Sequence, residues 1–188
     1  HADLLAKTQR LLRDEPAAAR GKTTVLTGTP APNGEVSAEL SGMLAIRSLA
    51  FKLQADNLPQ ALRSVVLQIA FDGRRTVWCP IGDFFGTGYR IHPYRTWYTQ
   101  VDEDGTLRCF WVMPFRERAK VTLLNLGEQP VDVVTGHIIT DEQPWDDRSL
   151  YFCAAWQQWA DIRTRSNPHS PDNGATDLNW VTIMGRGK

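Results

Sequence analysis

The chain has 188 residues, of which 42% are hydrophobic and 22% charged, values that are ordinary for one globular domain with a sizeable core. Its 21 basic and 21 acidic residues cancel, so no basic field is present to attract nucleic acid or an anionic membrane, and neither is expected as a partner. No apolar run approaches the roughly 20 residues that a membrane span needs.

The first part of the chain predicts one helix and an extended segment. Residues 3–13 carry two leucine pairs separated by good helix formers, which predicts a short amphipathic helix that Asp14-Glu15-Pro16 ends. This helix either packs on its own domain or serves a preceding domain or a neighbouring subunit. Residues 20–37 are rich in Gly, Thr and Pro and predict a linker or extended arm. We therefore divide the chain into residues 1–37, the helix and arm, and residues 38–188, a second domain.

Apolar residues alternate from residue 38 onward and change phase once. Leu44 and Ile46 share one parity, whereas Leu49 and Phe51 share the other. A one-residue phase change within a strand predicts a β-bulge, here near Arg47-Ser48.

A hairpin follows. Residues 65–71 alternate cleanly, and Asp72-Gly73 is a strong signal for a two-residue hairpin turn. The return strand runs up to Pro80. Residues 81–98 then form a long irregular segment, which in a compact domain is usually functional.

The remaining strand candidates are 107–113, 121–125, 131–139, 149–156 and 178–184, with a second long loop at 161–177. Both faces of 107–113 are apolar, which predicts a strand buried on both sides. About eight strands of irregular spacing indicate an all-β protein, an antiparallel jelly-roll sandwich with one short N-terminal helix. The residues predicted to lie in its core are Val65, Leu67, Ile69, Phe71, Trp111, Leu123 and Phe152.

The segment Pro80-Ile81-Gly82-Asp83-Phe84-Phe85-Gly86 places a carboxylate between glycines and two phenylalanines. This composition suits a sugar pocket, in which rings pack on the apolar face of the sugar and Asp83 binds its hydroxyls. The alternative is a hydrophobic turn in which Asp83 caps local amides. Trp97 and Tyr98 end the long loop and are predicted to form the rim of the pocket, although loop aromatics also anchor subunit interfaces.

The motif at 80–86, followed by Trp111-Val112-Met113-Pro114-Phe115, resembles glycoside hydrolase family 172 (GH172). The resemblance covers roughly residues 38–188 and departs from the family at Cys153 and Lys188, where histidine is usual. Its other segments, in chain order, are Ile69-Ala70-Phe71-Asp72-Gly73, Ala119-Lys120-Val121-Thr122-Leu123-Leu124-Asn125, Leu150-Tyr151-Phe152-Cys153-Ala154-Ala155-Trp156, Asp177-Leu178-Asn179-Trp180 and Gly185-Arg186-Gly187.

The resemblance implies a jelly-roll fold, a trimeric assembly and action on α-furanosides of fructose or arabinose. It also implies two catalytic glutamates beyond the Gly-Arg-Gly turn, which this chain does not contain, so both chain ends look like cut ends of a longer polypeptide. We therefore expect this chain to supply the scaffold and one wall of the pocket, with no catalytic residue. We also expect it to form a trimer or to associate with the rest of a parent chain. The alternative is a non-catalytic jelly-roll module for glycan binding or oligomer assembly.

The remaining candidates are weaker. The cysteines Cys79, Cys109 and Cys153 fall in apolar strands and are expected to be small buried hydrophobes, with a Cys79–Cys109 disulfide as the alternative. The acidic turn 102–105 is expected to be a solvated hairpin tip, with a loose calcium site as the alternative. Glycoside hydrolysis normally needs two carboxylates, but 141–142 and 146–147 look like polar turns. No metal or cofactor is expected.

Overall fold

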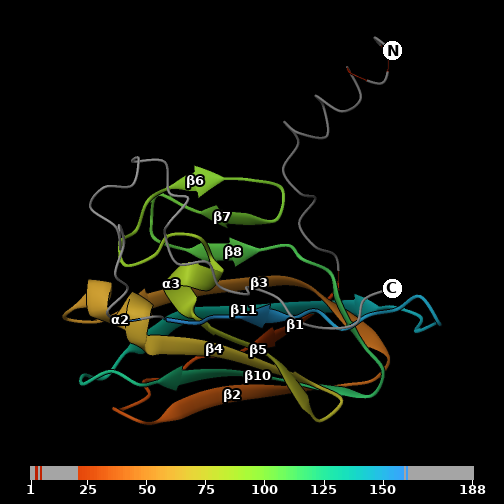
Figure 1. Cartoon of the computed structure of the whole chain (residues 1–188), viewed down its shortest axis with the longest axis horizontal. Helices are drawn as coiled ribbons and strands as arrows, with labels where there is room; N and C mark the ends of the chain where they lie inside the picture. The colour runs from red at the N-terminus through yellow and green to blue at the C-terminus, as the bar shows by residue number, and fades with distance from the viewer. Residues whose placement is uncertain (1–2, 4, 6–20, 159, 161–188) are drawn as a thin grey trace, which may run out of the picture. The chain divides into compact units, whose positions relative to one another are not determined.

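The computed structural model describes residues 3, 5, 21–158 and 160. Two sheets form a sandwich within a compact unit that comprises residues 1–156 (Figure 1). Residues 157–188 make a second unit, of which the structure describes 157, 158 and 160. No helix within the described residues is long and apolar enough to cross a membrane.

Within the described residues, the first sheet has seven strands. Six follow the order β1 (Lys22–Val25), β11 (Asp132–Glu142), β3 (Leu44–Gln54), β8 (Leu107–Cys109), β7 (Thr99–Val101) and β6 (Tyr94–Arg95), and β9 (Met113–Phe115) also pairs with β3.

The second sheet has five strands, in the order β12 (Ala154–Ala155), β5 (Arg74–Pro80), β4 (Val65–Phe71), β10 (Arg118–Asn125) and β2 (Glu35–Ser41). Every pairing between the described strands is antiparallel except that of β12 with β5. Two short helices, α2 (Leu58–Ser64) and α3 (Ile81–Phe84), flank β4 and β5 in the sequence. The predicted all-β antiparallel sandwich is confirmed.

The N-terminal predictions meet the structure only in part. The predicted helix at 3–13 lies outside the described residues, apart from Asp3 and Leu5, which are helical. The predicted arm at 20–37 contributes β1 to the edge of the first sheet and the start of β2 to the second. Leu26, just after β1, is buried in the core.

Two local predictions are confirmed in the strands. Ile139 of β11 pairs with Ser48 whereas Thr140 pairs with Ile46, so Arg47 is the extra residue of a bulge in β3. At the β4–β5 hairpin, Asp72 and Gly73 have φ of 49° and 82°. Positive φ at both central residues is the type I′ geometry whose twist matches the flanking strands.

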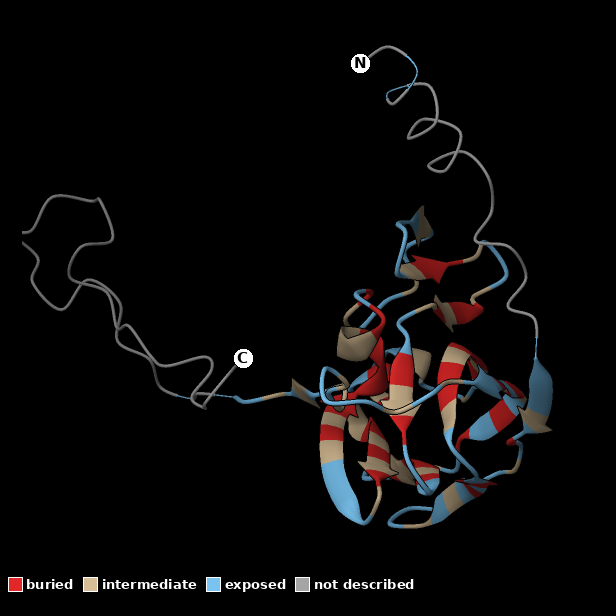
Figure 2. Cartoon of the chain, turned by 90° about the vertical axis from the view of Figure 1, so that its right-hand side faces the viewer, coloured by how far each residue is buried: buried red, intermediate tan, exposed pale blue. Residues whose placement is uncertain are grey.

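The core lies between the sheets, and the strands show bands of buried and exposed residues that follow their pleat (Figure 2). The clean alternation predicted for residues 65–71 places Val65, Leu67, Ile69 and Phe71 in this core, each fully buried, together with Leu123 of β10.

The prediction of one strand over 107–113 is wrong. Cys109 pairs with Leu49 and Met113 with Ile46, so three residues of this segment stand opposite two of β3. The segment therefore leaves the ladder at 110–112, beside the bulge at Arg47, and divides into β8 and β9. Trp111 turns outward and is 37% exposed, so its assignment to the core is also wrong.

Other predictions are corrected or fall outside the structure. Phe152 packs against the core but is only partly buried. The strand predicted at 149–156 is reduced to β12, and residues 161–177 and 178–184 lie outside the described residues. All three cysteines are free thiols, which excludes the disulfide alternative, and Cys153 is exposed although it was expected to be buried.

Candidate functional site

The candidate site begins at α2, which places an arginine beside the predicted sugar motif. The Asn57 side chain accepts the N–H of Gln60, and a proline in the first turn fits the start of a helix. Ala61 and Leu62 are buried. Arg63, in the last turn, is exposed along its side chain and faces α3.

Close backbone packing brings α3 against α2. A β-carbon added at Gly82 would lie 2.9 Å from the Leu62 carbonyl oxygen and 1.8 Å from that of Gly88. The Gly82 carbonyl accepts the N–H groups of Thr87 and Gly88, at 2.8 and 2.9 Å. Only glycine fits between these carbonyl groups. Because Gly82 touches Leu62, the next residues of the two helices, Asp83 and Arg63, also meet.

Asp83 and Arg63 form an ion pair. Nη1 of Arg63 lies 2.7 Å from Oδ1 and 2.5 Å from Oδ2 of Asp83. The Arg63 side chain is 42% exposed and that of Asp83 22%. The Arg63 guanidinium also lies 5.5 Å from the ring centroid of Trp156, within cation–π range. Burial and the nearby Asp83 charge raise the pKa of the Cys79 thiol to about 11, against the opposing effect of Arg63, so this thiol stays protonated.

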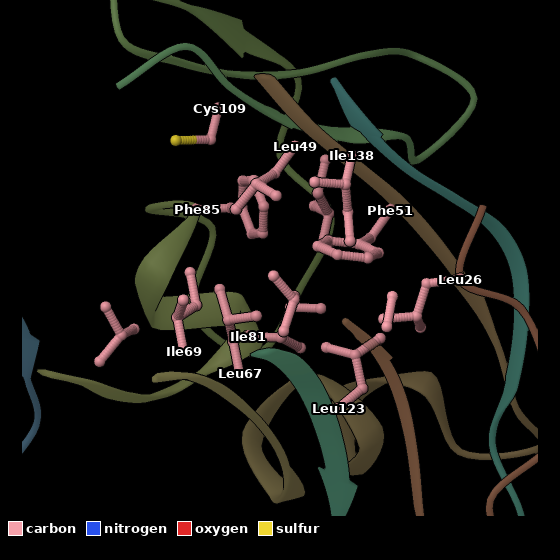
Figure 3. Packing of buried hydrophobic residues seen from close by; sticks show 14 of the residues in the cluster. Leu26, Leu49, Phe51, Leu67, Ile69, Ile81, Phe85, Cys109, Leu123 and Ile138 are labelled. Carbon is pink, nitrogen blue, oxygen red and sulfur yellow. The ribbon is translucent and has the colours of Figure 1, made fainter. Parts of the chain in front are cut away.

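Phe84 and Phe85 occupy different environments. Phe85 is fully buried and packs edge-on against Phe51, with ring centroids 6.2 Å apart (Figure 3). It is a core residue and offers no surface to a ligand in this conformation. Phe84 is half-buried and lies edge-on to Phe85, at 5.0 Å, and to Phe152, at 6.3 Å.

Phe84 begins a row of four aromatic side chains that ends at Tyr98. Phe152 lies 5.9 Å from Trp111, and Trp111 stacks on Tyr98 with ring centroids 3.9 Å apart and planes inclined by 6°. We call Phe84, Phe152, Trp111 and Tyr98 the aromatic row. Trp97, beside Tyr98 in the sequence, is 48% exposed. The structure thus connects Phe84, the neighbour of Asp83 in the sequence, to Tyr98 through Phe152 and Trp111.

The carboxylates outside this region serve local structure. Asp146 accepts hydrogen bonds from Arg148 and Ser149 within its own turn, and these bonds lower its pKa. Asp141 accepts the N–H of Glu142, its neighbour on β11. Both pairs remain turn or surface residues in the structure.

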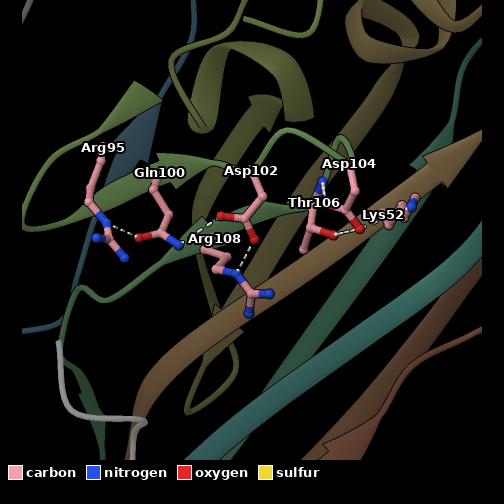
Figure 4. A network of polar contacts seen from close by, with 7 residues as sticks. All are labelled: Lys52, Arg95, Gln100, Asp102, Asp104, Thr106 and Arg108. Carbon is pink, nitrogen blue, oxygen red and sulfur yellow. Dashed lines mark hydrogen bonds and ion pairs between the residues drawn. The ribbon is translucent and has the colours of Figure 1, made fainter. Parts of the chain in front are cut away.

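In the acidic turn at 102–105, Asp102 and Asp104 also have hydrogen-bond partners on nearby residues (Figure 4). Asp102 binds Arg108 at 2.6 Å and Gln100 at 2.9 Å. Asp104 binds the N–H and hydroxyl of Thr106 and pairs with Lys52, which together lower its pKa to about 2. Within the described part of the chain, no group of three or more His, Cys, Asp or Glu side chains is arranged to hold a metal ion.

Sequence reasoning missed Arg63, Phe152 and Trp111 as parts of the site. Arg63 lies in no motif, and its helix is separated from Gly82-Asp83 by β4 and β5, so no local pattern in the sequence points to it. Trp111 and Phe152 follow a strand periodicity that favours the core. For Trp111 this prediction fails because residues 110–112 leave the ladder.

A family of known proteins matches the chain. The family model described as GH172 domain-like matches residues 28–137, which include α2, α3, the long loop and Trp111. No curated protein matches the chain. Since the matched stretch spans more than half of the 188 residues, the chain belongs to the GH172 family, a family of carbohydrate-active proteins.

Proposed function

We propose that this chain forms the scaffold and one wall of a furanoside-binding site in an enzyme that acts on α-furanosides of fructose or arabinose. The observation that carries the proposal is the Arg63–Asp83 ion pair, held by the α2–α3 contact beside an aromatic row of which Trp111 and Tyr98 are exposed. Sugar sites combine apolar rings with a few fixed polar groups in this way. Membership of the GH172 family supports carbohydrate as the ligand class.

Each group in the site has a separate role in this proposal. The Asp83 carboxylate accepts hydrogen bonds from sugar hydroxyls, and the rings of Phe84 and Tyr98 pack against the sugar's apolar C–H groups. Trp111 covers one face of Tyr98 and fixes that ring, and Trp97 lies next to it at the rim. Phe85 supports Phe84 from inside the core and has no contact with the sugar.

Asp83 is better suited to binding than to bond cleavage. A glycosidase uses two carboxylates, roughly 5 to 9.5 Å apart, one as the acid or acid/base and one as nucleophile or base. Both oxygens of Asp83 contact Arg63, which suits a hydrogen-bond acceptor better than a free nucleophile. We propose that the two catalytic carboxylates are supplied by sequence outside this chain.

Ligand titration followed by tryptophan fluorescence tests this function, since Trp97 and Trp111 are exposed. We expect aryl α-arabinofuranoside or α-fructofuranoside to bind, and Asp83→Asn and Tyr98→Ala to weaken binding roughly 10-fold or more, as loss of a charge-assisted hydrogen bond or a ring contact costs about 1.5 kcal/mol. The control is Asp141→Asn, because Asp141 is an exposed carboxylate on β11. Equal binding by all four proteins, or a preference for the matching pyranoside, would contradict the proposal.

A further inference from the structure

We infer that Arg63 is a specificity residue of this site, which together with Asp83 forms one donor–acceptor pair for adjacent hydroxyl groups of the sugar. The inference rests on the function proposed above and adds a residue that lies outside the Gly-Asp-Phe-Phe-Gly motif. It makes the ligand class narrower, because a sugar must present two neighbouring free hydroxyls to satisfy both partners.

The first argument is that the Arg63 guanidinium is held in place before any ligand arrives. Asp83 contacts its Nη1 from α3, and the ring of Trp156 lies 5.5 Å from its Cζ atom. Trp156 is itself 6.2 Å from Trp78 of β5. An arginine fixed by a carboxylate and an aromatic ring loses little side-chain entropy when it binds a further group.

The second argument is the distribution of donors and acceptors. Both contacts with Asp83 use Nη1 of Arg63, and a guanidinium carries N–H groups on two further nitrogens. The carboxylate oxygens of Asp83 have lone pairs beyond the one that each shares with Arg63. One hydroxyl can therefore accept from the guanidinium while its neighbour donates to the carboxylate.

The third argument is that this ion pair contributes little to folding. The two side chains are 42% and 22% exposed, and an ion pair in such a position typically contributes little to stability. The close α2–α3 contact at Gly82 instead depends on backbone packing. A variant of Arg63 should consequently fold, and its effect on binding can be measured separately.

The test is a double-mutant cycle, in which the Kd of each protein is measured for methyl α-arabinofuranoside and for its 2-deoxy analogue. Arg63→Met keeps the apolar stem and removes the donors. We expect it to weaken binding of the parent sugar about 10-fold, Arg63→Lys to restore part of that loss, and Arg63→Met/Asp83→Asn to be no weaker than the worse single variant. The 2-deoxy sugar should bind wild type about 10-fold more weakly than the parent sugar, because it can satisfy only one partner of the pair.

Lys120→Met is the matched control. Lys120 of β10 is 43% exposed along its side chain and pairs with Glu35 of β2, which is the edge strand at the other end of the second sheet from β12. Its binding should equal that of wild type, and its unfolding midpoint should match that of Arg63→Met. If Asp83→Asn weakens binding and Arg63→Met does not, the inference is wrong and the proposed function stands. If wild type binds neither furanoside, both fail. Additive losses in the double variant would also overturn the inference.

Discussion

Tyr98 and Trp111 lie face to face, with ring centroids 3.9 Å apart and planes inclined by only 6°. They come from the two sides of the β7–β8 region, Tyr98 just before β7 and Trp111 just after β8, and the N–H of Phe110 donates to the Tyr98 carbonyl at 2.8 Å. Both rings remain substantially exposed, at 47% and 37%. Trp111 is therefore a surface residue that fixes Tyr98, although its strand periodicity favoured the core.

This position of Trp111 sets the expected effect of removing it. Trp111→Ala should lower the free energy of unfolding by about 1–2 kcal/mol, less than the roughly 3–5 kcal/mol that loss of a buried aromatic ring costs. Phe85→Ala, which removes a fully buried ring, should show the larger loss. Chemical denaturation of both variants provides the comparison, and equal losses in the free energy of unfolding would mean that Trp111 contributes as a core residue does.

Gly82 should tolerate no side chain. A β-carbon there would lie 1.8 Å from the Gly88 carbonyl oxygen, so Gly82→Ala must separate α3 from its neighbours and should cost about 3 kcal/mol or more. It should also release Asp83 from Arg63. Gly88→Ala is the control: its φ is +67° but a β-carbon there meets no atom within 4 Å, so we expect only about 1 kcal/mol. Thermal melts of the two variants that coincide would contradict this packing.

Asp72 should stabilise the fold in a pH-dependent manner. Although partial burial raises its pKa, hydrogen bonds from the N–H groups of Arg116, Arg118 and Glu117 and from the Tyr151 hydroxyl hold that pKa below its usual value. Stability from a carboxylate with a lowered folded-state pKa is present above the unfolded pKa, near 3.9, and is lost as pH falls through the folded pKa.

We therefore expect Asp72→Ala to lose about 1–3 kcal/mol at pH 7, from the hydrogen bonds removed, and to show a smaller further loss than wild type when the pH falls below about 4. Urea unfolding at pH 7 and at pH 3 measures this difference. Asp141→Ala, which removes an exposed carboxylate that accepts its neighbour's N–H, is the control and should stay close to wild type in stability at pH 7. If the free energy of unfolding of Asp72→Ala changed with pH in the same way as that of wild type, Asp72 would not be the origin of the acid sensitivity.

The chain alone should show no hydrolysis of aryl α-fructofuranosides or α-arabinofuranosides above background, because Asp83 is engaged by Arg63. In a protein that contains the catalytic carboxylates, Asp83→Asn should lose about 2–4 kcal/mol of transition-state stabilisation, roughly 30- to 1000-fold in kcat/KM. Release of the aryl group, followed by absorbance, measures both. Turnover by the chain alone that Asp83→Ala abolishes would assign catalysis to Asp83.

We propose that the protein assembles as a homo-oligomer, with three-fold symmetry as the expected form. Trp97 is 48% exposed at the end of the long loop, where an aromatic side chain can anchor a subunit contact. Light scattering should give a mass near three times the 21.2 kDa chain, and Trp97→Ser should shift it toward the monomer. A single species near 21.2 kDa for wild type would contradict the assembly.

Local rules determined the strands of this protein. Residues 65–71 have a period of two, Asp72-Gly73 suits only a tight turn with positive φ, and the phase change at Arg47 predicted the bulge that the structure shows. Each of these features depends on the pleat of one strand or on the dihedral angles of two residues, so neighbours in the sequence contain enough information. The Gly-Asp-Phe-Phe-Gly motif within residues 80–86 likewise lies in one continuous segment, and the family match over residues 28–137 includes it.

The tertiary structure decided which of these residues share a surface. Arg63 meets Asp83 because α2 and α3 touch through the backbone at Leu62 and Gly82, a contact between segments separated by β4 and β5. Trp111 faces outward because three residues stand opposite two of β3, which no pattern within 107–113 reveals. Phe85 follows Phe84 in the sequence, yet Phe85 is buried and Phe84 is not, since a helical turn points successive side chains in different directions.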